Sequence, residues 1–141
     1  MKILIVEDDE DQAQDLEQTL RREFRGVQCR RVELEEDFQN EFEEIASEHF
    51  DLAIVDMMLE WADPSPNMSP PPGPYDEAGL RCRNKLKQDS RTATIPVIML
   101  SVLRRDMPPE VDYVVKTPEL RELVEMVRKI AKPGAATTRS R

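Results

Sequence analysis

Carboxylate side chains stand just after two of the apolar runs in this 141-residue chain. Asp8 and Asp9 come after residues 3–6, Ile-Leu-Ile-Val, and Asp56 comes after residues 52–55, Leu-Ala-Ile-Val. Three carboxylates held close together repel one another, so either their pKa values rise or a hard divalent cation neutralises them. Mg²⁺ is the natural occupant of such a group, because a Mg²⁺ ion held by carboxylates and waters keeps positions for phosphate oxygens.

A lysine and a hydroxyl take the same place after two further apolar runs. Lys116 follows residues 113–115, and Ser101 follows residues 97–100. A lysine opposite the carboxylates adds a point charge for an anion, and a carboxylate at such a centre can attack phosphorus as a nucleophile. A nearby hydroxyl can donate a hydrogen bond to the new phosphoryl oxygens. Taken singly, each residue has an ordinary structural interpretation, and only their joint placement predicts a site that accepts a phosphoryl group.

These side chains meet only if the apolar runs are strands of one parallel sheet. Short, continuous, β-branched runs are typical of strands buried on both faces, and ligands of open α/β sheets bind at the carboxyl ends of the strands. The expected strands are residues 3–6, 27–32, 52–56, 95–100 and 112–115. Apolar residues at helical spacing predict helices over residues 10–24, from about residue 37, over 79–88, and after Thr117 with Pro118 in the first turn.

Strands that alternate with helices favour a flavodoxin-like, doubly wound, five-stranded parallel sheet of order 2-1-3-4-5. This order brings the first strand beside the third. Asp8, Asp9 and Asp56 are therefore expected to converge at one edge of the sheet.

Composition limits the class of partner. The net charge of -9 argues against duplex DNA or an anionic membrane as the main partner, because a phosphate-binding face needs a basic stripe. No stretch resembles a signal-peptide core or a membrane span, and no helix-turn-helix follows the last helix. Cys29 and Cys82 lack a metal-binding spacing and are expected to be free thiols of a reducing compartment. We therefore expect a cytoplasmic domain without direct nucleic-acid or membrane binding.

Residues 61–75 hold six of the eleven prolines, so they can form neither regular helix nor central strand. We expect an exposed loop that leans towards polyproline II and interrupts one domain. Trp61 and Tyr75 would serve as anchors for a kinase or a downstream partner. The alternative is a surface insertion that the fold merely tolerates.

Four separated motifs, in this order, resemble those of response-regulator receiver domains of two-component signalling. The likeness extends over roughly Lys2 to Ile130. The motifs are Val6-Glu7-Asp8-Asp9, Ile54-Val55-Asp56-Met57-Met58-Leu59, Val97-Ile98-Met99-Leu100-Ser101 and Asp112-Tyr113-Val114-Val115-Lys116.

The resemblance implies roles for the acidic residues and a cofactor. Asp56 would be the phosphoacceptor. Asp9, Asp56 and the backbone carbonyl of Met58 would bind Mg²⁺ directly, with Asp8 acting through water.

The resemblance also implies roles for three other residues and a class of partner. Lys116 would bind the phosphoryl group, and Ser101 and Tyr113 would form the switch pair. The partner would be a sensor histidine kinase or a phosphotransfer protein. The chain would be a signalling domain rather than an enzyme, although it would assist its own phosphorylation and dephosphorylation.

The chain departs from the receiver pattern near these motifs. Thr117 precedes Pro118, where the family usually has proline directly after the lysine, and Val102 replaces a small residue, which should restrict access to an acyl phosphate. Only 15 positions separate Ser101 from Lys116, so the fourth helix of the receiver pattern is expected to be short or irregular. Because receivers commonly pair through the face that contains this helix, we expect a monomer.

We therefore expect a receiver domain over residues 1–131, with a proline-rich insertion at 60–77 and a flexible tail at 132–141. A receiver-like interaction scaffold that works without phosphorylation is the alternative. A Mg²⁺-dependent aspartyl-phosphate phosphatase also attacks with a strand-end aspartate, but it needs an acid–base carboxylate where this chain has Met58.

Overall fold

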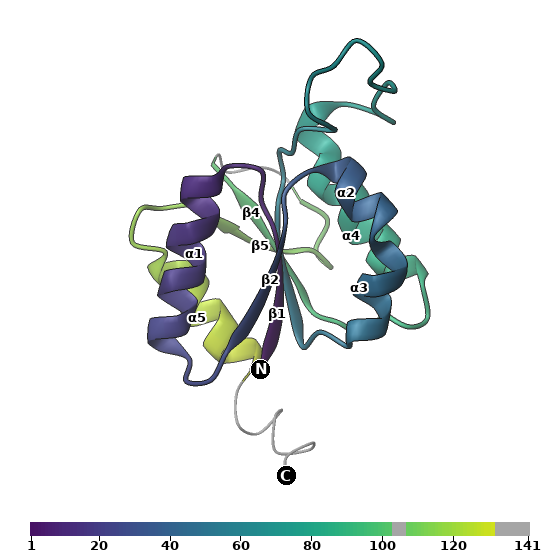
Figure 1. The fold of residues 1–141 in the computed structure, drawn as a ribbon. Helices are drawn as coiled ribbons and strands as arrows, with labels where there is room; N and C mark the ends of the chain where they lie inside the picture. Colours follow the sequence, from purple (N-terminus) through teal and green to yellow (C-terminus); the bar gives the residue numbers. More distant parts are fainter. Residues whose placement is uncertain (103–106, 132–141) are drawn as a thin grey trace.

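The computed structural model describes residues 1–102 and 107–131, which form one five-stranded parallel sheet between two layers of helices (Figure 1). The strand order is β2-β1-β3-β4-β5. The strands are β1 (Lys2–Val6), β2 (Gln28–Val32), β3 (Leu52–Asp56), β4 (Val97–Ser101) and β5 (Asp112–Val115). The predicted flavodoxin-like order is confirmed, whereas the tail expected at 132–141 lies outside the described residues.

Helices cover both faces of the sheet. The layer on one face consists of α1 (Glu10–Glu23) and α5 (Arg121–Ile130) (Figure 1). The layer on the other face consists of α2 (Glu35–Asn40), α3 (Phe42–Glu48) and α4 (Ala78–Gln88), and the short 3₁₀ helix η1 (Tyr75–Glu77) leads into α4. None of the described helices combines the length and the apolar character needed to cross a bilayer.

Alternate residues of each strand enter two separate cores, one under each helical layer. Ile3 and Ile5 of β1 pack with Leu16 of α1 and Leu123 of α5. Leu4 and Val6, the alternate residues of the same strand, belong to the opposite core. There they pack with helix residues Phe38, Ile45, Cys82 and Leu86. Residues on neighbouring strands follow the same alternation, because all pairs are parallel and in register. The position of a residue along its strand therefore decides which helical layer its side chain meets.

The helical pattern predicted from about residue 37 divides into α2 and α3. The break is at Glu41, whose φ of -97° and ψ of 7° leave the helical region, while its N–H still donates to Asp37 at 2.8 Å. The rings of Phe38 and Phe42 pack edge to face across this break, 5.7 Å between centroids. His49 then takes a left-handed conformation, φ 59°, and ends α3.

The prediction that Pro118 lies in the first turn of the last helix is wrong. Residues 117–120 form a turn in which Leu120 N–H donates to the Thr117 carbonyl at 3.1 Å. Leu120 is left-handed, φ 54°, so the helix begins only at Arg121. The apolar face identified from the sequence is nevertheless buried through Leu123 and Val127.

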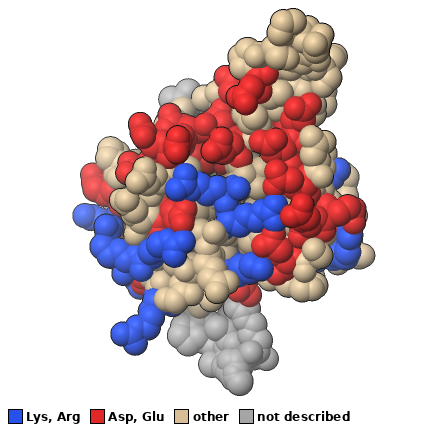
Figure 2. All heavy atoms as spheres, viewed as in Figure 1, with Lys and Arg blue, Asp and Glu red and all other residues tan. Residues whose placement is uncertain are grey.

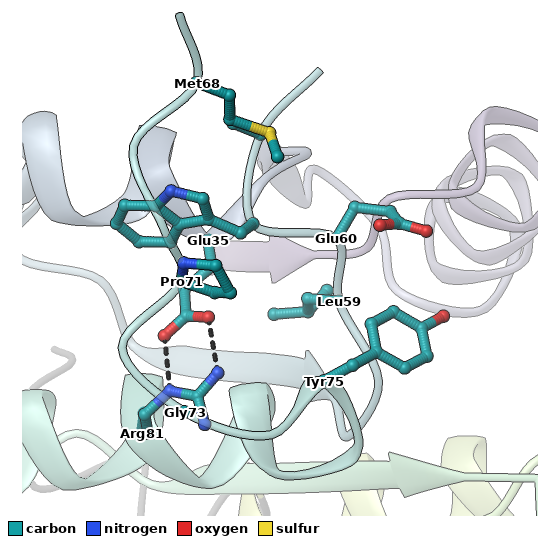
Figure 3. A pocket seen from close by; sticks show the side chains of 10 residues that line it. Glu35, Leu59, Glu60, Met68, Pro71, Gly73, Tyr75 and Arg81 are labelled. Carbon is teal, nitrogen blue, oxygen red and sulfur yellow. Dashed lines mark hydrogen bonds and ion pairs between the residues drawn. The ribbon is translucent and has the colours of Figure 1, made fainter. Parts of the chain in front are cut away.

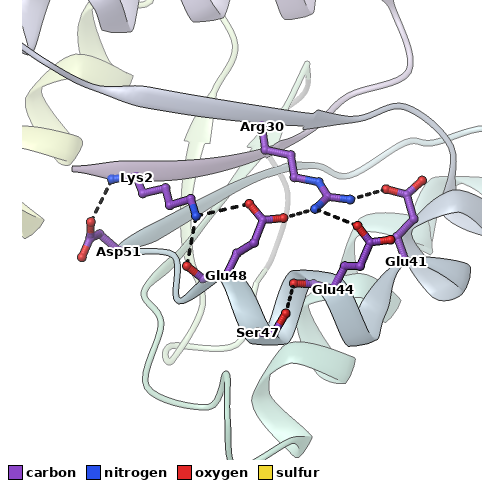
Figure 4. Close-up of polar contacts among 7 residues, drawn as sticks. All are labelled: Lys2, Arg30, Glu41, Glu44, Ser47, Glu48 and Asp51. Carbon is purple, nitrogen blue, oxygen red and sulfur yellow. Dashed lines mark hydrogen bonds and ion pairs between the residues drawn. The ribbon is translucent and has the colours of Figure 1, made fainter.

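The edge strand β2 is fixed to α3 by a network of charged side chains (Figure 4). The Arg30 guanidinium binds Glu41 at 2.6 Å and also contacts Glu48. Lys2 joins Glu48 from β1, with 3.3 Å between Nζ and the carboxylate, while its backbone N–H donates to Asp51 at 2.8 Å. Charged side chains of this kind protect an edge strand from pairing with another chain.

The segment between β3 and η1 has neither helix nor strand, as predicted, and projects beyond the end of the sheet (Figure 1). We call residues 60–74 the proline-rich loop. Of the segment between β4 and β5, residues 102 and 107–111 are not helical. Residues 103–106, on which the expected short fourth helix partly falls, lie outside the described residues.

Candidate functional site

Three carboxylates meet at the carboxyl ends of β1 and β3. One oxygen atom from each of Glu7, Asp8 and Asp56 lies within 4.8 Å of the others, and we call this group the acidic cluster. The register of the sheet explains the meeting, because Val6 pairs with Val55 and the next residues along both strands are Glu7 and Asp56. Their exposed fractions are only 3% and 7%. Figure 2 shows further Asp and Glu side chains gathered over the upper part of the molecule, below the projecting loop.

Lys116 reaches this cluster from the end of β5. Its Nζ lies 2.7 Å from Asp56 Oδ2 and 2.8 Å from Glu7 Oε1, and it also contacts the side-chain oxygen of Gln12. The backbone N–H of Lys116 donates to the Ser101 carbonyl at 2.7 Å, which continues the pairing of β5 with β4 up to the lysine. The ammonium group is thus positioned by the sheet itself, despite Thr117 following it.

The closeness of these groups changes their pKa values. Burial raises the pKa of Glu7 to about 8, and the hydrogen bond and charge of Asp56 act in the same direction, while Lys116 opposes them. Burial alone would lower the pKa of Lys116, but its hydrogen bonds and ion pairs with Asp56 and Glu7 outweigh burial, so that this pKa is raised. The lysine is therefore charged at neutral pH, and the Glu7 carboxyl group binds a proton more readily than an ordinary glutamate does.

Asp9 was expected to converge with Asp8 and Asp56, but the acidic cluster contains Glu7 in its place. Asp9 is the N-cap of α1, where its side chain accepts from the Gln12 N–H at 3.0 Å. Glu7 takes the place expected for Asp9. The alternation of side chains along β1 could have identified Glu7, because Glu7 follows Ile3 and Ile5 on the same face. The strand pairing also continues to this residue, since the Glu7 N–H donates to the Val32 carbonyl at 3.0 Å.

The backbone around Asp56 is tightly packed. Met58 N–H donates to Asp56 Oδ1 at 3.2 Å, and Gly79 N–H of α4 donates to the Met57 carbonyl at 2.9 Å. A Cβ atom at Gly79 would lie 2.1 Å from the carbonyl oxygen of Asp56, so only glycine allows α4 this approach. Metal binding by the Met58 carbonyl stays a prediction.

The expected switch residues lie on β4 and β5, the two strands that follow β3 in the sheet order. Asp56 pairs with Leu100, so the buried Ser101 is the next residue along β4. Tyr113 of β5 pairs with Met99 and packs, half-buried, against the core under the α2–α4 layer. Val102 is 50% exposed and lines a cavity of about 260 Å³ together with Lys116. The positions agree with the sequence analysis, and the roles stay predictions.

The acidic cluster has the donor chemistry of a magnesium site. Its three ligand atoms are carboxylate oxygens, the hard donors that Mg²⁺ prefers, and Glu7 and Asp56 lie at the ends of the adjacent strands β1 and β3. A bound divalent cation would favour the deprotonated form of Glu7, because metal ligands bind without their proton. The residues present therefore fit Mg²⁺.

Comparison with known proteins gives matches among solved structures only. No family model and no curated protein matches the chain. A signal receiver domain of two-component signal transduction from Clostridium thermocellum is 21% identical, with a TM-score of 0.70 over 93% of this chain and 97% of that one. The response regulator TrrA of Thermotoga maritima, in complex with Mg²⁺-BeF, is 23% identical, with a TM-score of 0.64 over 92% and 97%.

The same Thermotoga maritima regulator, in complex with the histidine kinase ThkA, is 22% identical, with a TM-score of 0.63 over 92% of this chain and 97% of that one. All three matches extend over at least 92% of this chain, with TM-scores of at least 0.63. The chain therefore has the fold of a response-regulator receiver domain.

Proposed function

We propose that residues 1–131 form a receiver that accepts a phosphoryl group on Asp56, in a Mg²⁺-dependent reaction, and signals by changing conformation. The observation that carries the proposal is the contact between the buried Asp56 carboxylate and Lys116 Nζ, 2.7 Å apart, within the acidic cluster. A lysine that already binds the carboxylate oxygen is placed to bind the oxygens of a phosphoryl group attached there.

In this reaction an Asp56 oxygen attacks phosphorus, a new O–P bond forms, and the bond from phosphorus to the donor's leaving group breaks. Lys116 then donates to a phosphoryl oxygen instead of to the free carboxylate. Ser101 follows Leu100, the residue of β4 that pairs with Asp56. Its hydroxyl donates a hydrogen bond to another phosphoryl oxygen. Mg²⁺ held by Glu7, Asp8, Asp56 and the Met58 carbonyl would neutralise charge on the phosphoryl oxygens.

The partner we propose is a sensor histidine kinase or a phosphotransfer protein of the cytoplasm. Support comes from the Thermotoga maritima regulator of the same fold, whose solved complex contains a histidine kinase. We also propose a monomer, because the described residues between β4 and β5 form no helix that could build a dimer face with β5 and α5. Sedimentation at micromolar concentration, with and without beryllofluoride and Mg²⁺, tests this; a dimer formed only with beryllofluoride would contradict it.

Intact-mass measurement after incubation with acetyl phosphate tests the proposed function. The wild-type chain should gain one phosphoryl group with Mg²⁺ and none when the metal is chelated. Asp56→Asn should gain none, because the amide keeps the shape of the side chain but is not a nucleophile. Asp112→Asn, which changes an exposed carboxylate at the start of β5, is the matched control and should behave as wild type.

Two other outcomes would favour the competing functions. A folded wild-type chain that takes up no phosphoryl group would favour the receiver-like interaction scaffold. Repeated release of free phosphate from small phosphoesters would favour the aspartyl-phosphate phosphatase.

A further inference from the structure

Both ends of the proline-rich loop are hydrogen-bonded to the two residues of one buried ion pair, Glu35 and Arg81. Arg81 of α4 binds the fully buried Glu35 carboxylate through two hydrogen bonds, 2.7 and 2.8 Å long. At the start of the loop, the Glu35 N–H donates to the Glu60 carbonyl at 2.9 Å. At its end, Arg81 Nη1 donates to the Pro74 carbonyl at 2.8 Å. The loop is thus held against the α2–α4 layer.

Between the anchored ends, the loop encloses a small, largely apolar cavity. Its volume is about 130 Å³, and its walls include Leu59, Trp61, Met68, Pro71 and Tyr75 (Figure 3). Met68 and Tyr75 are 41% and 48% exposed. They are two of the three large apolar side chains that the described residues leave exposed. Exposed apolar groups around a preformed hollow are typical of a contact surface for another molecule.

The rim of this cavity, by which we mean the exposed residues of the segment 60–77 that encloses it, is acidic. Residues 60–77 contain Glu60, Asp63, Asp76 and Glu77 and no Lys or Arg. All four carboxylates are on exposed residues, and red side chains surround the base of the loop in Figure 2. Glu36 of α2 adds another carboxylate, which accepts from Ser69 Oγ of the loop at 3.5 Å. Such a surface repels anionic lipid and nucleic acid and attracts a cationic partner.

We propose that this cavity, which the paired Glu35 and Arg81 also line, forms with its rim over residues 59–77 a docking surface for a protein segment in which one apolar side chain is flanked by Lys or Arg. The apolar side chain enters the cavity beside Met68 and Tyr75, and the cations lie on the carboxylates of the rim. Because both loop ends are anchored before binding, little backbone entropy is lost when the segment docks. The surface does not use Asp56 as a ligand, so the proposal is independent of phosphoryl transfer.

The test uses a probe peptide, acetyl-Gly-Arg-Lys-Leu-Arg-Gly-amide, and the ¹⁵N-labelled full chain. Amide shift changes should gather in residues 59–77, and the fluorescence of Trp61, the only tryptophan, should change over the same titration. Binding should weaken as salt rises, because the rim charges are exposed. A peptide with Gly in place of Leu should bind more weakly, and one with Glu in place of every cation should not bind.

Two pairs of variants separate specific docking from general attraction to an acidic protein. Met68→Ser with Tyr75→Ser should weaken binding of the probe at least about fivefold, whereas Val102→Ser, which removes the third exposed apolar side chain, should leave it within about twofold. Asp63→Asn with Asp76→Asn should weaken it similarly, whereas Glu119→Gln with Glu125→Gln on the α5 side should not. Equal effects of the paired variants, or shift changes spread over other acidic surfaces, would overturn the proposal.

Discussion

Lys116 Nζ donates to Asp56 Oδ2 over 2.7 Å although 60 positions separate the two residues. Both side chains are mostly buried, so the ion pair is shielded from solvent. The same carboxylate belongs to the acidic cluster, where it is proposed to bind Mg²⁺. Lys116 would therefore compete with a bound cation for Asp56, although the two would act together on a phosphoryl group.

Replacing Lys116 by Met should separate these two effects. Loss of the positive charge should raise the affinity for Mg²⁺ at least about threefold, since repulsion between the ammonium and the cation disappears. Phosphoryl uptake from acetyl phosphate should nevertheless fall, because no ammonium binds the phosphoryl oxygens. Calorimetry and intact mass measure the two quantities, with Lys129→Met on the exposed face of α5 as control. Unchanged or weaker Mg²⁺ binding would show that Lys116 does not compete for Asp56.

Substitutions at three adjacent acidic residues should distinguish the metal site from the helix cap. Asp8→Asn should lower Mg²⁺ affinity at least about tenfold, because it removes a charged oxygen ligand, and Glu7→Gln should act in the same direction. Asp9→Asn should change it less than about threefold, since Asn caps a helix as well as Asp does. Asp9→Ala should instead reduce the free energy of unfolding by about 0.5–2 kcal/mol. Equal losses of Mg²⁺ affinity in Asp8→Asn and Asp9→Asn would contradict this assignment.

Gly79→Ala should destabilise the protein by about 1–3 kcal/mol. The added Cβ would lie 2.1 Å from the Asp56 carbonyl, so α4 must move away from the end of β3. Phosphoryl uptake should fall as well, because Asp56 lies at that point. Urea unfolding measures the first effect. Asn84→Ala, at an exposed position of the same helix, should not destabilise the protein, and a Gly79→Ala protein as stable as wild type would refute the close approach.

Arg81→Met should cost about 3 kcal/mol of unfolding free energy, because it leaves the buried Glu35 carboxylate without a counter-charge. The double variant Arg81→Met with Glu35→Leu should recover most of this loss. Arg91→Met, which breaks exposed ion pairs with Glu43 and Asp89, is the control and should change the unfolding midpoint little. If the double variant is no more stable than Arg81→Met, the ion pair is not the cause.

Most of the fold could be predicted from the sequence, because strands buried on both faces are continuous apolar runs. β5 was predicted with its observed bounds, and β3 with its end at Asp56. The break at Glu41 and the turn before α5 could not be predicted in this way. Both depend on local backbone conformations, such as the left-handed Leu120, that apolar spacing does not report.

The placement of the candidate residues could be predicted to within one residue, and their roles stay predictions. Asp8, Asp56, Ser101 and Lys116 lie at the strand ends where the apolar runs placed them. Whether Glu7 or Asp9 joins the acidic cluster depends on the pairing of β1 with β2, which continues one residue beyond the apolar run, to Glu7. The pairing of Glu35 with Arg81 was beyond sequence reasoning, because 46 positions separate the two side chains and neither belongs to a motif.

The anchoring of the loop at Glu60 and Pro74 also affects how this segment can change over evolutionary time. Once two ends are fixed side by side, the entropy of closing the chain between them grows only slowly with length, by about 0.6 kcal/mol for each doubling. Residues 62–73 are therefore free to be lengthened, shortened or replaced by a foreign peptide with little cost to the sheet. The same two anchors would hold any such replacement near the carboxyl end of β3, which makes this loop a natural place for recombination and for grafted epitopes.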